Sequence, residues 1–144
     1  MPLDSYGRSI HYLRISLTDK CNMRCVYCMA EDMVFMPNDD LLTTPELQRL
    51  IRLFARLGVD KVRLTGGEPS IHPDLLTIVR SVRDAGITAI SMTTNGLKLT
   101  ELARPLKAAG LERVNVSVDT LDPERFQRVT RWGKLDKVLD GIYA

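Results

Sequence analysis

All three cysteines of this 144-residue chain lie close together, at Cys21, Cys25 and Cys28, in the spacing C-x3-C-x2-C. Three cysteines cannot all pair with one another as disulfides, and so tight a group is typical of a metal site. Structural zinc needs four ligands, and the nearest histidine, His11, lies ten residues upstream of Cys21. Three thiolates instead suit a 4Fe-4S cluster whose fourth iron has no protein ligand. The alternatives are structural zinc and three cysteines that are merely buried.

The fourth iron of such a cluster has a position that is open to a small chelating molecule. S-adenosylmethionine carries an amino and a carboxylate group that could occupy this position. An electron passed from the cluster into the sulfonium would then release a 5′-deoxyadenosyl radical. The cysteine spacing therefore predicts a 4Fe-4S cluster and S-adenosylmethionine as cofactors, and an external electron donor as a partner.

The cysteine spacing, with the aromatic Tyr27 before the last cysteine, resembles the signature of the radical S-adenosylmethionine superfamily. The longer run from Leu13 to Asn22, with Gly7-Arg8 before it and Met29 after it, resembles one family within it, GTP 3′,8-cyclase (molybdenum cofactor biosynthesis protein A). The resemblance extends over essentially all 144 residues but includes only the N-terminal part of the family's pattern. It implies a lyase that converts GTP to 3′,8-cyclo-7,8-dihydro-GTP, the first step of molybdenum cofactor biosynthesis.

The same resemblance implies roles for individual residues. Family positions that contact S-adenosylmethionine correspond to Tyr27, Gly67 and Ser117. Positions that contact GTP correspond to Arg14, Arg63 and Thr93. No catalytic side chain beyond the cluster ligands is implied. The run Ser70-Ile71-His72 departs from the family, which often has an arginine near this point.

The family also holds a second 4Fe-4S cluster near its C-terminus and has a partial TIM-type barrel of six βα units. In this sequence all cysteines belong to the first cluster, and only about four βα units are visible. We therefore expect residues 1–144 to be the radical S-adenosylmethionine core, without the C-terminal units and the second cluster region. The chain is then a portion of a longer enzyme or a truncated relative, with weak or no cyclase activity alone and an exposed sheet edge.

Four apolar strands alternate with helices along the chain, which predicts an α/β fold built from parallel βα units. The strands are expected at residues 10–17, 62–65, 90–93 and 114–119. Helices are expected to begin at Thr43, Asp74, Thr100, Asp122 and Lys134. Pro105 is expected to interrupt the third helix, and glycines 58, 86 and 110 to end the first three.

Polar and apolar residues alternate within each strand, as in the run Leu13-Arg14-Ile15-Ser16. Because alternate side chains point to opposite faces, one face is apolar and can lie under the helices, whereas the other is polar in all four strands. A curved sheet would place this polar face on its concave side. Arg14 and Arg63 on that face indicate an anionic ligand, and an ordinary solvent-facing sheet is the alternative.

Ligands of barrel-like sheets bind at the carboxyl ends of the strands, where the loops lie. The cysteines follow the first strand, and Gly66-Gly67-Glu68-Pro69 follows the second. Adjacent glycines allow the backbone to approach a ligand closely. Glu68 is expected to fix this loop or to meet the ammonium of S-adenosylmethionine, with a salt bridge to Arg63 as the alternative. His72 is expected to pack or cap, and Trp132 to face a partner or pack in the core.

The composition argues against several functions. The net charge is only +2, and there is no polybasic tract for nucleic acid or a membrane surface. No apolar run approaches the roughly 18 residues of a membrane span, and the N-terminus does not resemble a signal peptide. We therefore expect a cytoplasmic, single-domain protein that binds neither nucleic acid nor membranes. The sequence leaves a homodimer open.

Two other functions remain open at this point. A different radical S-adenosylmethionine enzyme, such as a peptide-modifying one, would share the cysteines and Gly66-Gly67-Glu68 but would have no use for Arg14 and Arg63. A non-catalytic, metal-stabilised module would carry zinc rather than iron in the purified protein.

Overall fold

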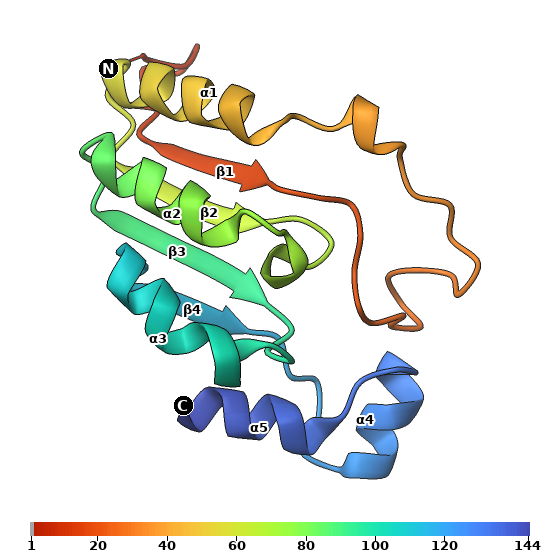
Figure 1. Cartoon of the computed structure of the whole chain (residues 1–144). Helices are drawn as coiled ribbons and strands as arrows, with labels where there is room; N and C mark the ends of the chain where they lie inside the picture. Colours follow the sequence, from red (N-terminus) through yellow and green to blue (C-terminus); the bar gives the residue numbers. More distant parts are fainter. Residues whose placement is uncertain (1) are drawn as a thin grey trace.

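The computed structural model describes residues 2–144, which form a parallel four-stranded sheet with helices packed on one face (Figure 1). The strands are β1 (Tyr12–Ser16), β2 (Lys61–Thr65), β3 (Ala89–Thr94) and β4 (Arg113–Val116), and they lie in the order β1-β2-β3-β4. Every neighbouring pair is parallel, so each connection is a crossover that returns the chain to the starting end of the next strand. The predicted α/β fold with four parallel βα units is confirmed.

The helices are α1 (Thr44–Arg56), α2 (Leu75–Asp84), α3 (Leu99–Ala109), α4 (Pro123–Thr130) and α5 (Leu135–Tyr143). Two short 3-10 helices lie at Asn38–Asp40 and Pro69–Ile71. Helices α1, α2 and α3 cover the sheet, and α5 packs beside α3 (Figure 1). All five helices begin at or next to the residues that the sequence predicts.

Side-chain caps explain where these helices start. Glu46 accepts hydrogen bonds from the backbone N–H and the hydroxyl of Thr43, at 2.8 and 2.7 Å. Asp122 accepts the N–H of Arg125 at 2.8 Å, within the first turn of α4. Both satisfy groups that a helix N-terminus or its cap otherwise leaves without partners. At the other end of α1, Gly58 has a φ of 97°, a conformation that favours glycine.

Helix α3 runs through Pro105 without a break, so the predicted interruption is wrong. Proline removes one hydrogen bond from a helix and crowds the preceding turn. Leu106 and Ala109, which follow it, are both buried in the core. The packing of this turn outweighs the local cost of the proline.

The core lies between the sheet and helices α1 to α3. Val62, Leu64, Ile90 and Met92 of the two central strands are fully buried in it. The predicted apolar face is thus confirmed where the strands are central. On the edge strand β4, Val114 is 38% exposed, because no further strand lies beside it within residues 2–144.

Polar side chains line the opposite face of the sheet. The strand register places Arg14 beside Arg63, Arg63 beside Ser91, and Ser91 beside Arg113. These four residues form a row across all the strands, which we call the cationic row. Helices α1, α2 and α3 lie on the other face, so they do not cover this row (Figure 1).

The segment between β1 and α1 is irregular except for its 3-10 turn, and it extends beyond the carboxyl ends of the strands (Figure 1). Helix α4 lies at this same end of the molecule. The cysteine loop, residues 21–28, is part of this segment. The topology therefore brings the cysteines, the loops after β2 and β3, and α4 to one end of the sheet.

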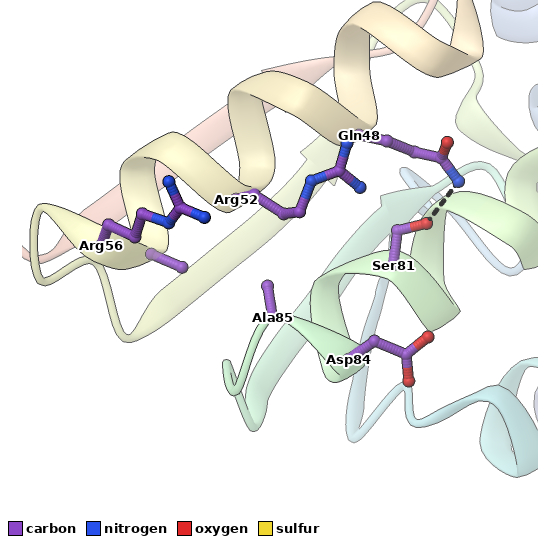
Figure 2. A pocket seen from close by; sticks show the side chains of 7 residues that line it. Gln48, Arg52, Arg56, Ser81, Asp84 and Ala85 are labelled. Carbon is purple, nitrogen blue, oxygen red and sulfur yellow. Dashed lines mark hydrogen bonds between the residues drawn. The ribbon is translucent and has the colours of Figure 1, made fainter.

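A groove of about 410 Å³ lies on the outer side, between α1 and α2 (Figure 2). Gln48 of α1 donates to the hydroxyl of Ser81 of α2 at 2.8 Å, and Arg52, Arg56 and Asp84 also line the groove. It contains none of the predicted site residues.

No helix within residues 2–144 is long and apolar enough to cross a membrane.

Candidate functional site

A pocket of about 220 Å³ lies at the carboxyl ends of the strands. It is lined by the three cysteines and by residues from the loops after β2, β3 and β4. All predicted site residues except the two arginines line it, namely Cys21, Cys25, Cys28, Tyr27, Gly67, Thr93 and Ser117. Residues almost 100 positions apart in the sequence therefore meet at one site.

The three cysteines are free thiols that differ in burial. Cys21 and Cys25 are half-buried, whereas Cys28 is exposed. Burial raises the pKa of the Cys21 thiol, and the N–H of Met23, which donates to its Sγ at 3.4 Å, opposes that rise. Burial also raises the pKa of the Cys25 thiol. Metal ligation reverses this, because a metal holds the thiolate form.

The sulfur of Cys21 has a second donor nearby. The side-chain amide of Asn95, in the loop after β3, approaches it at 3.9 Å and donates to Asn22 Oδ1 at 2.7 Å. N–H groups directed at sulfur suit a thiolate ligand of an iron–sulfur cluster. Within residues 2–144, no three His, Cys, Asp or Glu side chains converge as ligands of one ion. All three thiols line one pocket.

Gly66 and Gly67 hold the loop after β2 against the start of the cysteine loop. The N–H of Gly67 donates to the carbonyl of Thr18 at 2.6 Å, and the N–H of Glu68 donates to that of Lys20 at 2.8 Å. A Cβ at Gly67 would overlap the carbonyl oxygens of Asp19 and Lys20, and one at Gly66 would lie 2.5 Å from that of Thr18. The glycines are thus required by loop-to-loop packing, whereas the sequence suggested only approach to a ligand.

Glu68 fixes these loops from inside the protein. It is 1% exposed, and its carboxylate accepts hydrogen bonds from the N–H of Ser70 at 2.9 Å, the hydroxyl of Thr94 at 2.6 Å and the N–H of Asn95 at 2.7 Å. Three donors satisfy a carboxylate that would otherwise be costly to bury. Of the expected roles, fixing the loop is therefore the one observed. The alternative salt bridge to Arg63 is wrong, because the carboxylate is engaged elsewhere.

Tyr27 connects the cysteine loop with the segment that follows β4. Its hydroxyl donates to Asp119 Oδ2 at 2.8 Å, across 92 positions of sequence. Partial burial of the hydroxyl, together with the Asp119 carboxylate, raises the pKa of Tyr27, so the phenol stays protonated and donating. Asp119 ends the segment 114–119 that the sequence predicts as a strand, and the sequence analysis assigned it no role.

The two predicted GTP-binding arginines lie away from the thiol pocket, on the cationic row. Arg14 is exposed, and its Nε is 3.4 Å from the hydroxyl of Tyr12. Arg63 is partly buried and lines a second pocket of about 280 Å³ near the start of the strands. Lys61 and Arg113 line this pocket too and were missed. The alternation that identified Arg63 also marks Lys61, two positions earlier on the same face.

Two further residues have defined roles in the structure. His72 accepts the N–H of Asp74 on Nδ1 at 3.1 Å, so it caps, as expected. Burial lowers the pKa of His72, and the Asp74 carboxylate opposes this. Trp132 is 48% exposed, so it does not pack in the core. Its ring lies against the guanidinium of Arg24, 4.3 Å from ring centre to Cζ.

A family model described as the Radical SAM superfamily matches residues 15–144. Among curated proteins, the GTP 3′,8-cyclases of Bradyrhizobium diazoefficiens and Marinobacter nauticus are each 51% identical to this chain over 98% of its length. That of Rhodopseudomonas palustris (strain TIE-1) is 52% identical over the same share. The chain spans only 42 to 43% of the length of these relatives.

Solved structures with similar folds are more distant in sequence. Streptococcus suis SuiB bound to its precursor peptide SuiA is 19% identical, with a TM-score of 0.74 over 91% of this chain and 29% of that one. Native anSMEcpe with bound AdoMet and a peptide is 16% identical, with a TM-score of 0.66 over 92% of this chain and 39% of that one. The likeness in fold confirms the predicted partial TIM-type barrel architecture.

Proposed function

Because the chain belongs to the radical S-adenosylmethionine superfamily, we propose that it supplies the cluster- and cofactor-binding part of a GTP 3′,8-cyclase. The observation that carries this proposal is a single sheet with a thiol-lined pocket at one end and a cationic row along its uncovered face. Identity of about 50% to GTP 3′,8-cyclases over nearly the whole chain supports the choice of substrate.

Membership of this superfamily implies a 4Fe-4S cluster and S-adenosylmethionine, and the residues present fit both groups. Cys21, Cys25 and Cys28 border one pocket, and N–H donors face the sulfur of Cys21. When bound, the cluster and S-adenosylmethionine supply the one-electron chemistry that allows hydrogen abstraction from an unactivated carbon. Gly67, Tyr27 and Ser117 line the rest of this pocket and are the residues proposed to contact S-adenosylmethionine.

GTP is proposed to lie along the uncovered face of the sheet. Its phosphates would contact Arg14 and Arg63, with Lys61 and Arg113 adding positive charge nearby. Thr93 belongs to β3 and also lines the thiol pocket, so it lies between the two ends of this face. An extended nucleotide in this orientation presents its sugar and base toward the cysteines. This chain offers no further cysteines for a second cluster, and we expect weak or no cyclase activity from it alone.

Anaerobic reconstitution with iron and sulfide, followed by reduction in the presence of S-adenosylmethionine, tests the superfamily chemistry. We expect one oxygen-sensitive 4Fe-4S cluster per chain and formation of 5′-deoxyadenosine, with neither in Cys25→Ser. Zinc in place of iron in the purified protein would favour the metal-stabilised module instead.

Equilibrium dialysis with GTP tests the substrate. Removal of one guanidinium that binds a phosphate should weaken binding about tenfold, so Arg14→Ala and Arg63→Ala should each do so. Arg49→Ala, on the exposed side of α1, is the matched control and should bind as the unaltered chain does. Unchanged affinity in both test variants would favour a different radical enzyme, such as a peptide-modifying one. A homodimer and the electron donor remain proposals.

A further inference from the structure

Arg24 places a buried positive charge between the first two cysteines. The residue is 7% exposed, and one guanidinium nitrogen donates to the carbonyls of Cys21 and Met23, at 2.8 and 2.9 Å. Within residues 2–144 no carboxylate forms an ion pair with it. A buried guanidinium without a carboxylate is costly unless other groups stabilise its charge.

Two aromatic rings lie against this guanidinium. Its Cζ lies 4.3 Å from the centre of the Trp132 ring and 5.0 Å from that of the Phe35 ring. Trp132 follows α4, and Phe35 lies in the segment after the cysteines. Cation–π contact with both rings compensates part of the lost hydration of the guanidinium.

The cysteine loop is also bonded to the carboxyl end of α4. The N–H of Arg24 donates to the carbonyl of Thr130 at 3.1 Å, and that of Val26 donates to the carbonyl of Val129 at 2.9 Å. A helix leaves its last carbonyls without partners, and the cysteine loop supplies these. Gly133 allows the chain to turn closely past the end of α4, because a Cβ there would overlap the Thr130 hydroxyl and the Phe126 ring.

The backbone turn after α4 has an unfavourable conformation at Arg131. Arg131 has a φ of 60° and a ψ of −55°, and the N–H of Trp132 donates back to the carbonyl of Thr130 at 2.7 Å, which makes a γ-turn of the rare positive-φ form. The side chain of Arg131 donates to the carbonyls of Arg24 and Met29, each at 3.3 Å. Such strain persists only where the surrounding contacts enforce it.

From these contacts we infer that Trp132 is a positioning residue. Its ring fixes the Arg24 guanidinium, and this contact, which we call the clamp, holds the cysteine loop in the conformation that binds the cluster before any cluster is present. Arg24 in turn supplies the positive charge that offsets the thiolates once they ligate iron. The second statement rests on the proposed function. The first concerns the protein without a cluster and does not.

The clamp is tested by amide exchange in the cluster-free 144-residue chain, followed residue by residue by NMR. Trp132→Leu keeps an apolar side chain but removes the π face, and should accelerate exchange of the Arg24 and Val26 amides about tenfold. Trp132→Phe should retain slow exchange. The amides of Gly67 and Glu68, on the other side of the cysteine loop, serve as internal controls and should not change. Tyr143→Ala, which removes an exposed aromatic elsewhere, should change none of them.

A second set of variants connects Arg24 with Trp132. Arg24→Lys keeps the positive charge but lacks the planar guanidinium that stacks on the rings. It should also accelerate exchange of the Arg24 and Val26 amides. The double variant Arg24→Lys, Trp132→Leu should accelerate amide exchange by less than the product of the two single effects. Both substitutions remove the same contact, which can be lost only once. Unchanged exchange of the Arg24 and Val26 amides in Trp132→Leu would overturn the clamp, as would equal acceleration of every amide in β2 and β3.

The charge role has its own measurement, made on the reconstituted chain. Removal of a nearby cation disfavours the reduced cluster, so Arg24→Met should lower the midpoint potential, whereas Arg24→Lys should lower it less. Identical potentials in the two variants would overturn this role. If the unaltered chain takes up no cluster while Trp132→Leu still loosens the loop, the proposed function fails and the clamp stands.

Discussion

The backbone N–H of Gly67 donates to the carbonyl of Thr18 at 2.6 Å, which joins the loops that follow β1 and β2. These residues lie 49 positions apart in the sequence, and Gly67 lines the thiol pocket. The separation of the two backbones leaves no room for a side chain at Gly67. The position of the cysteine loop therefore depends on a residue that carries no functional group.

Replacement of Gly67 by alanine should destabilise the chain, because the new Cβ must displace the carbonyls of Asp19 and Lys20. We expect a loss of about 2 kcal/mol in the free energy of unfolding, measured by urea denaturation, from the forced backbone shift. Gly7→Ala is the matched control: its Cβ would meet nothing within 4 Å, and only its φ of 76° is unfavourable. That variant should lose about 1 kcal/mol. A loss at Gly67 that does not exceed the loss at Gly7 would contradict this prediction.

Glu68→Gln should also destabilise the chain, by about 2 kcal/mol, because an amide cannot accept all three hydrogen bonds that the carboxylate accepts. Thr94→Val, which removes one of these donors, should lose about 1 kcal/mol. Glu112→Gln changes an exposed glutamate and should stay within about 0.5 kcal/mol of the unaltered chain. If Glu68→Gln and Glu112→Gln unfold at the same denaturant concentration, the buried carboxylate contributes nothing to stability.

The stability of the chain should fall in mild acid partly through His72. Burial lowers the pKa of His72 in the folded state, and its Nδ1 must be unprotonated to accept the N–H of Asp74. The unfolded chain therefore takes up the proton first, so this contribution is complete above about pH 6.5 and is lost as the pH falls from there toward the lower pKa of the folded state.

Urea denaturation at pH 7, 6 and 5 measures this effect, and His72→Asn isolates it. Asparagine keeps an acceptor for the Asp74 amide but does not titrate. The unaltered chain should lose more free energy of unfolding than His72→Asn between pH 7 and 5. A constant difference between the two proteins at all three pH values would contradict the assignment.

The γ-turn at Arg131 makes a prediction that separates backbone strain from side-chain contacts. Both Arg131→Gly and Arg131→Ala lose the donors to the Arg24 and Met29 carbonyls. Only glycine adopts a φ of 60° at little cost. Arg131→Gly should therefore be more stable than Arg131→Ala by about 1 kcal/mol in urea denaturation. Equal stability would mean that the turn is not strained, or that it rearranges in both variants.

The parts of the site that are local in sequence could be predicted. The cysteine spacing, the alternation around Arg14 and Arg63 and the capping residues at Thr43 and Asp122 all act within a few positions, and the structure places each of them as expected. The partners of Gly67, Glu68 and Arg24 could not be predicted, because each contact joins segments that only the fold brings together.

The misjudged features have physical causes of the same kind. Pro105 breaks a helix in isolation, but packing of the following turn holds α3 together. Glu68 and Arg63 have opposite charges five positions apart, yet the carboxylate turns into the core toward Thr94 and Asn95. Trp132 lies in a loop, and nothing in its local sequence indicates that it stacks on Arg24.

The attachment of residues 24 and 26 to the end of α4 sets an order of events during synthesis. About 100 residues separate the cysteines from this attachment, so a ribosome that adds about 5 to 20 residues per second exposes the thiols for roughly 5 to 20 s before their anchor exists. During that interval the thiols are open to oxidation and to the wrong metal. A cluster can therefore enter a pocket of final shape only after α4 has been synthesised.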